Sequence, residues 1–167
     1  MATIPYDPTK VTLCVFGENI TELGASPITL TFNSDYITHT AGMQGDHAVT
    51  KNPDRSAILS FSLQQNARLN GVLAGFLAAA DEDEVWPEFP CTLNDPSSPF
   101  LPIMKDCSLR KPPAVSYGME QADVTWEIFV KDCKLVPKDQ AGTSVVSIVA
   151  TANSMYEGYK KIADLFK

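Results

Sequence analysis

The sequence is poor in the residues and motifs that catalysis and metal binding usually require. Its 167 residues include only two histidines, His39 and His47, and four cysteines without a C-x-x-C pair. The motifs of zinc proteases, α/β-hydrolases and phosphate-binding loops do not occur in it. The two histidines and Asp46 could form only a sparse metal site, and a polar strand residue plus an exposed loop residue is the simpler interpretation. We therefore predict a protein that is not an enzyme, with no catalytic residue, no metal site and no cofactor.

Basic residues and long apolar runs are also scarce. The chain has 13 Lys and Arg against 20 Asp and Glu, a formal charge of -7, which argues against a protein that clamps duplex DNA or binds an anionic membrane. The longest weakly polar stretch, residues 72–80, is far shorter than the ~20 residues needed to cross a bilayer. No basic stretch leading into an apolar run opens the sequence, so we expect synthesis in the cytoplasm and no membrane partner.

Most of the chain instead shows the alternation of apolar and polar residues that is typical of antiparallel strands. The clearest case is residues 57–64, where Ala57, Leu59, Phe61 and Leu63 alternate with Ile58, Ser60, Ser62 and Gln64. Residues 28–32 alternate apolar side chains with threonine in the same way. Further strands are expected at 11–16 with a hairpin return at 20–21, and at 36–41, 89–93, 100–109 and 123–136.

Two segments have helical spacing. Apolar residues at Leu69, Val72, Leu73, Phe76, Leu77 and Ala80 predict one helix over about 66–80, ending before the acidic run 81–84. A second apolar series runs from Val145 to Phe166. We therefore predict a mainly β fold, a barrel or sandwich of two antiparallel sheets with one packed α-helix, over residues 1–136, and a C-terminal helical extension over 137–167.

Residues 42–55 fit neither pattern. They contain two glycines and one proline and have little apolar content, so we expect a long hairpin or loop that projects from the fold. Segments of this length without a core of their own usually have a task, often contact with a partner.

Certain residues, by their order along the chain, indicate a family. They are Tyr6-Asp7-Pro8, Val11, Gly17, Asp35-Tyr36, Gly42-Met43-Gln44-Gly45, Lys51-Asn52-Pro53-Asp54-Arg55-Ser56, Leu63, Gln65, Asn70, Lys111-Pro112-Pro113, Tyr117-Gly118 and Trp126. Over about residues 6–136 the chain resembles the tail tube proteins of contractile-tailed (myovirus-type) bacteriophages, most specifically in the Asn-x-Asp-Arg-Ser stretch before an alternating strand. It departs from the family at Ala57, where glycine is expected, and at Ala67-Arg68, which replaces Ser-Pro.

The resemblance implies a homo-oligomer in which six copies close into a ring and rings stack into a hollow tube inside a contractile sheath. The implied partners are the tail sheath, baseplate and tail-terminator proteins. The tape measure protein and genomic DNA would pass through the lumen without sequence-specific binding. The implied location is the virion, with assembly in the host cytoplasm.

Two groups of residues acquire hypothetical roles beside this resemblance. The expected inter-ring contact loop consists of Gly42, Gln44, Gly45, Asp46, His47, Lys51, Asp54 and Arg55. The expected lumen-facing residues are Thr29, Thr31, Ser60 and Ser62, whose hydroxyls would keep a channel wet without binding phosphate. Because the chain is acidic, we expect a negatively charged or polar lumen that repels DNA.

Other functions remain open at this point. The same kind of chain could form the inner tube of a contractile injection or type VI-like secretion apparatus. It could also be a monomeric β-barrel binding or immunity-type module with an apolar pocket. An enzyme built around His39, His47 and a cysteine is the least supported of these alternatives.

Overall fold

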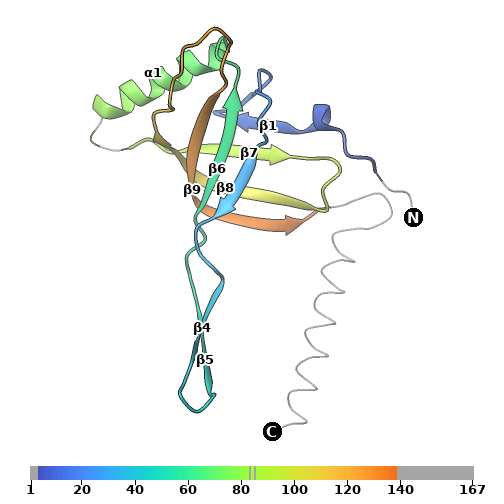
Figure 1. Ribbon diagram of the computed structural model, residues 1–167, viewed down its shortest axis with the longest axis vertical. Coiled ribbons are helices and arrows are strands. Elements are labelled where there is room, and N and C mark those ends of the chain that lie inside the picture. The colour runs from blue at the N-terminus through green and yellow to red at the C-terminus, as the bar shows by residue number, and fades with distance from the viewer. Residues whose placement is uncertain (1–3, 83, 85, 139–167) are drawn as a thin grey trace.

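The alternating segments form antiparallel strands in the computed structural model, which describes residues 4–82, 84 and 86–138 (Figure 1). Seven strands make one sheet in the order β2-β1-β7-β8-β9-β6-β3. Their bounds are β1 Thr12–Val15, β2 Glu18–Asn19, β3 Thr29–Phe32, β6 Ala57–Leu63, β7 Phe89–Asn94, β8 Phe100–Lys111 and β9 Val124–Pro137. Strands β4 (Ile37–Ala41) and β5 (His47–Lys51) form a separate two-stranded sheet. The predicted mainly β class with two antiparallel sheets is confirmed.

The large sheet is strongly bent. In Figure 1, β9 first runs beside β6 and then turns, so that its second half crosses the direction of its first half. The burial pattern of β9 changes phase at this bend, because Val130 and Cys133 are both buried although they are three residues apart. On the paired strand β8, Asp106 has φ +53, a left-handed conformation that aspartate tolerates better than most residues. The bend lets one sheet wrap around the core.

The core lies on the concave face of this sheet, where alternate side chains from several strands converge. Its largest fully buried members are Leu13, Val15, Leu59, Phe61, Leu63, Leu73, Cys107, Trp126, Ile128, Val130 and Cys133. Leu59, Phe61 and Leu63 are the apolar positions that the alternation of residues 57–64 assigns to one face.

The helix α1 (Arg68–Glu82) is the single α-helix in the part of the chain that the structure describes, and a short 3-10 turn (Pro8–Lys10) precedes β1. At its start the carboxylate of Glu22 accepts a hydrogen bond from the Arg68 amide at 3.0 Å, which favours a helix beginning there. The helix includes Asp81 and Glu82, so it extends two residues beyond the predicted end at residue 80. No described helix is long and apolar enough to cross a membrane.

Side chains of α1 attach it to the sheet at two places. Phe76 contacts Phe16 and Phe89, with ring centroids 4.6 and 5.5 Å away. Asn70 accepts a hydrogen bond from the indole N–H of Trp126 at 2.9 Å. The helix therefore closes one end of the core. The predicted extension over 137–167 lies, from residue 139 onward, outside the described residues.

Candidate assembly surfaces

The β4–β5 hairpin extends away from the rest of the molecule (Figure 1). Its strands pair in register from Ile37 opposite Lys51 to Ala41 opposite His47, and all ten strand residues are exposed. An isolated two-stranded hairpin is only marginally stable in water. A projecting hairpin with no buried side chain must therefore be held by its base, by a partner, or by both.

The tip of the hairpin is a tight turn built around two glycines. The Gly42 amide donates to the Asp46 carbonyl at 2.7 Å, and the Gly45 amide donates to the Gly42 carbonyl at 3.0 Å. Gly45 has φ +88, a backbone conformation that favours glycine, whereas Gly42 is not in that region. Glycine at position 45 is thus required by the turn.

The two faces of the hairpin differ in chemistry. Because directly opposed residues share a face, His39 and Val49 lie together with Ile37 and Lys51 on one side. Ile37 and Val49 are 56% and 63% exposed, and we call this side the apolar hairpin face. The other side carries threonines, including Thr50. The composition of the hairpin did not predict these two different faces, although the alternation of threonine with other residues over 37–41 indicates them.

Asp54 organises the base of the hairpin. Its carboxylate accepts hydrogen bonds from the Ser34 hydroxyl at 2.6 Å and from the Ser56 amide at 3.0 Å. The bonds from Ser34 and Ser56 lower the pKa of Asp54, because they stabilise the ionised carboxylate. The Asn52 side chain accepts from the Asp54 amide at 3.0 Å. The Asn-x-Asp-Arg-Ser stretch therefore fixes the backbone conformation at the base of the hairpin.

Arg55 adds further contacts at the base of the hairpin. Its guanidinium lies 4.0 Å from the ring centroid of Tyr36 and donates to the Asn52 carbonyl at 2.7 Å. The Arg55 carbonyl in turn accepts from the Cys133 amide of β9 at 2.9 Å. These contacts connect both legs of the hairpin to the large sheet.

The predicted contact loop is therefore divided by the structure. Six of its members are exposed on the hairpin or its tip, namely Gly42, Gln44, Gly45, Asp46, His47 and Lys51. Asp54 and Arg55 lie at the base, where the contacts just described are internal to the chain. Their position suits holding the hairpin at a fixed angle.

The convex face of the sheet carries the predicted lumen residues. Thr29 pairs with Ser60 and Thr31 with Ile58, so these side chains share one face with Glu127, which is opposite Ser60. Glu127 accepts a hydrogen bond from the Arg110 guanidinium at 2.7 Å. The Lys111 ammonium lies 3.6 Å from the same carboxylate, so the face combines hydroxyls with a cluster of mixed charge.

Ser62 does not share this exposure, contrary to our expectation. Its side chain is only 1% exposed, and its hydroxyl has no hydrogen-bond partner. The reason is that the segment around Gly24 covers it: the Gly24 amide donates to the Ser62 carbonyl at 2.8 Å. A Cβ built on Gly24 would come within 2.8 Å of the Ser62 hydroxyl.

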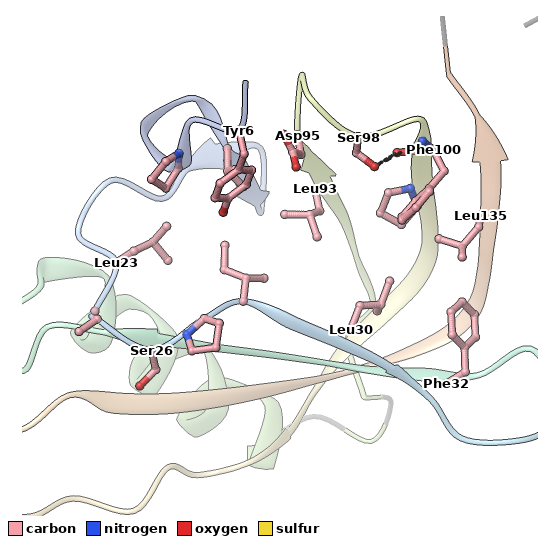
Figure 2. Close-up of a pocket in the computed structure, with 17 residues that line it drawn as sticks. Tyr6, Leu23, Ser26, Leu30, Phe32, Leu93, Asp95, Ser98, Phe100 and Leu135 are labelled. Atoms are coloured by element: carbon pink, nitrogen blue, oxygen red, sulfur yellow. Dashed lines mark hydrogen bonds between the residues drawn. The ribbon is translucent and has the colours of Figure 1, made fainter. Parts of the chain in front are cut away.

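A third surface is an apolar groove of about 750 Å³ between edge strand β3 and the ends of β7, β8 and β9. Figure 2 shows Leu30 and Phe32 of β3 on one side of this hollow and Leu93 of β7 and Leu135 of β9 on the other. Tyr6, Leu23, Ile28 and Phe100 also line it. Ile28, Leu30, Phe32 and Leu93 pack partly against the core, so the groove is an open end of that core.

The described residues contain little reactive chemistry. No group of three or more His, Cys, Asp or Glu side chains among them could hold a metal ion. His39 and His47 occupy diagonal positions on one face of the hairpin. The four cysteines are free, and burial raises the pKa of the Cys133 thiol to about 11, which keeps it protonated near neutral pH.

Comparisons with known proteins identify the fold. No family model matches the sequence, and no curated protein is significantly similar to it. Among solved structures, the chain is similar to the tube-terminating cap of the anti-feeding prophage, with a TM-score of 0.55 and 9% identity over 83% of this chain and 95% of the other. It is also similar to a chain of the PVC sheath-tube complex of an extracellular contractile injection system, with a TM-score of 0.52 and 8% identity over 80% and 93% of the two chains. The chain therefore has a fold that occurs in the cap and sheath-tube assemblies of contractile injection systems.

Proposed function

We propose that this chain is a structural subunit of a tail tube, which forms stacked rings inside a contractile sheath. In this proposal six copies close each ring, and a polar lumen conducts DNA from a phage virion. The sheath, baseplate and terminator proteins are its partners in the particle, and the tape measure protein occupies the lumen before DNA does. The chain performs no catalysis in this role.

The observation that carries the proposal is the β4–β5 hairpin. It exposes every strand residue, yet the hydrogen bonds of Asp54 and the Tyr36–Arg55 contact fix its base. A hairpin whose base is fixed by internal contacts, but whose strand residues are all exposed, is suited to binding a neighbouring molecule. In a stack of rings, the next ring supplies that neighbour.

The edges of the large sheet support ring closure. Strand β3 is the last strand on one side and β2 the last on the other, so each presents unpaired backbone groups. Head-to-tail contact between such edges generates a closed ring when the rotation between copies allows it. Thr29, Thr31 and Ser60 then face the bore, together with the mixed-charge cluster of Glu127 and Arg110.

This local charge works against the expected repulsion of DNA. Glu127 lies beside two cations, Arg110 and Lys111, so that cluster is net positive although the chain is acidic. Because repulsion is screened over about 8 Å at physiological ionic strength, residues near the bore determine what DNA meets. In our proposal, hydroxyl groups and this mixed-charge cluster give the bore a hydrated wall.

The test is polymerisation of the purified full chain, observed by negative-stain electron microscopy. Rings or tubes are expected at high concentration, and deletion of residues 44–50 should leave a folded subunit that does not polymerise. Molecules that stay single at 18.2 kDa at every concentration would contradict the proposal.

Two exposed methionines provide a matched pair of substitutions. Met43 at the hairpin tip and Met119 in the loop before β9 are both fully exposed. Met43→Asp should weaken polymerisation, whereas Met119→Asp should leave it unchanged. If Met119→Asp alone weakens it, the assembly contact lies in that loop and the assigned role of the hairpin is wrong.

A second candidate is the inner tube, or the cap that ends it, in a contractile injection apparatus. The likeness to the anti-feeding prophage cap favours it. A tube subunit adds copies at both ends of a ring, whereas a cap stops growth. Excess purified protein added to preformed short tubes would lengthen them in the first case and block further growth in the second.

A further inference from the structure

We propose that residues 139–167 of the same chain dock in the apolar groove between β3 and the ends of β7, β8 and β9. In the described residues the rim of this groove leaves Leu135 46% exposed and Phe100 about equally so. Apolar surface that extends the core outward in this way is usually covered by a partner or another segment. This inference does not depend on tube formation.

The described chain ends at the groove itself. The Lys138 ammonium donates to the Asn94 side-chain oxygen at 2.6 Å and to the Asp95 carbonyl at 2.9 Å, and its amide donates to the Pro99 carbonyl at 3.0 Å. Asp95 lines the groove, and so do Ser98 and Phe100 on either side of Pro99. Lys138 is thus fixed at the rim, and residue 139 begins there.

The following segment has the length and pattern to fill the groove. Its apolar series starts at Val145, and the six residues from 139 to 144 can span at most ~20 Å, enough to turn back from the rim. From Val145 to Phe166 apolar side chains recur at helical spacing, which predicts a continuous apolar stripe about 33 Å long. A stripe of this kind needs an apolar surface to cover it.

The charges of the two surfaces are compatible. Asp95 is the one charged residue among the described residues that line the groove, and its carboxylate is occupied by the amide and hydroxyl of Ser97 at 2.9 and 2.7 Å. Residues 139–167 contain three acidic and three basic side chains, so their net charge is zero. Docking therefore brings together two surfaces without net electrostatic repulsion.

Attachment in the same chain favours this occupant over the equivalent segment of a second copy. A short connection gives a tethered segment an effective concentration of about millimolar. A free copy reaches that level only in concentrated solution. The groove is therefore filled within one molecule before any ring forms.

The test is hydrogen–deuterium exchange on the full chain, measured by mass spectrometry at low and high protein concentration. We expect amides within 145–166 to be protected equally at both concentrations. Leu135→Lys should reduce this protection about tenfold, because it replaces an apolar contact in the groove with a charge. The control is Ile103→Lys: Ile103 is 40% exposed on β8, next to Pro102, which pairs with Leu135, but it does not line the groove, so its substitution should have no effect.

Four outcomes would overturn the inference. Absence of protection in the parent chain would show that the segment does not dock. Equal loss in the two lysine variants would show that the groove is not its site. Protection that appears only at high protein concentration would show that the segment of a second copy occupies the groove. If residues 145–166 are unprotected and an apolar small molecule is recovered with the purified protein, the groove is a ligand site.

Discussion

Replacing Val49 with alanine tests whether the apolar hairpin face is an assembly contact. Val49 is 63% exposed, so its burial can occur only against a neighbour. The change removes two methyl groups, and burying each of them fully contributes about 0.8 kcal/mol. Only the 63% of the side chain that is exposed can become buried in a contact, so the loss of association free energy is about 1 kcal/mol per contact. The concentration needed for polymerisation should therefore rise about fivefold. Sedimentation of polymer across a dilution series measures it.

The matched control is Thr50→Ala on the opposite face of the same strand. Both substitutions remove a β-branched side chain, so both lower strand propensity by a similar amount. We expect Thr50→Ala to change the polymerisation threshold by less than about twofold and both variants to unfold thermally like the parent chain. An unchanged threshold for Val49→Ala, or a larger effect of Thr50→Ala, would refute the assignment of that face.

Three further substitutions test the fold. Gly24→Ala should destabilise the chain by about 1–3 kcal/mol in urea unfolding, because the added carbon would collide with the Asp123 carboxylate and with the buried Ser62 hydroxyl; unchanged stability would disprove that close approach. Asn70→Ala should destabilise it by about 1–3 kcal/mol by leaving the indole N–H of Trp126 unpaired and removing the donor to the Gln64 carbonyl, and the same substitution should cost less in a Trp126→Phe background. Because the pKa of Asp54 is lowered in the folded chain, the ionised carboxylate stabilises the fold above pH 3.8, its ordinary pKa, and this stabilisation is lost as the pH falls through the lowered pKa. The amide resonance of Ser56, which donates to this carboxylate, should therefore shift only below pH 3.8, and in Asp54→Asn it should not shift at all.

Periodicity predicted the elements whose partners are local or repetitive. Strand β6 and helix α1 follow directly from the spacing of their apolar residues, because the buried face of each is continuous. The end of α1 was placed two residues early, since the acidic residues Asp81 and Glu82 continue the helix. The return strand of the first hairpin starts at Glu18, ahead of the predicted residues 20–21, because Phe16 and Gly17 both adopt positive φ and form the turn.

Features that depend on distant segments could not be read from the sequence. Strand β4 has an alternating pattern like that of β3, but alternation does not say whether the core or another molecule covers the apolar side. Ser62 belongs to a polar series, yet the approach of Gly24, almost forty residues earlier, buries it. The groove is missed for the same reason, since its lining comes from segments far apart in the chain.

The two edge strands, β2 and β3, are short, and this affects how copies of the chain would associate. Strand β2 has two residues and β3 has four, so any strand-to-strand junction between copies can contain only a few backbone hydrogen bonds. In the proposed ring, each junction alone would be weak, so an isolated pair of copies would dissociate readily. Growth would then await a nucleus in which several junctions close at once, which keeps newly made molecules dispersed until a template starts the process.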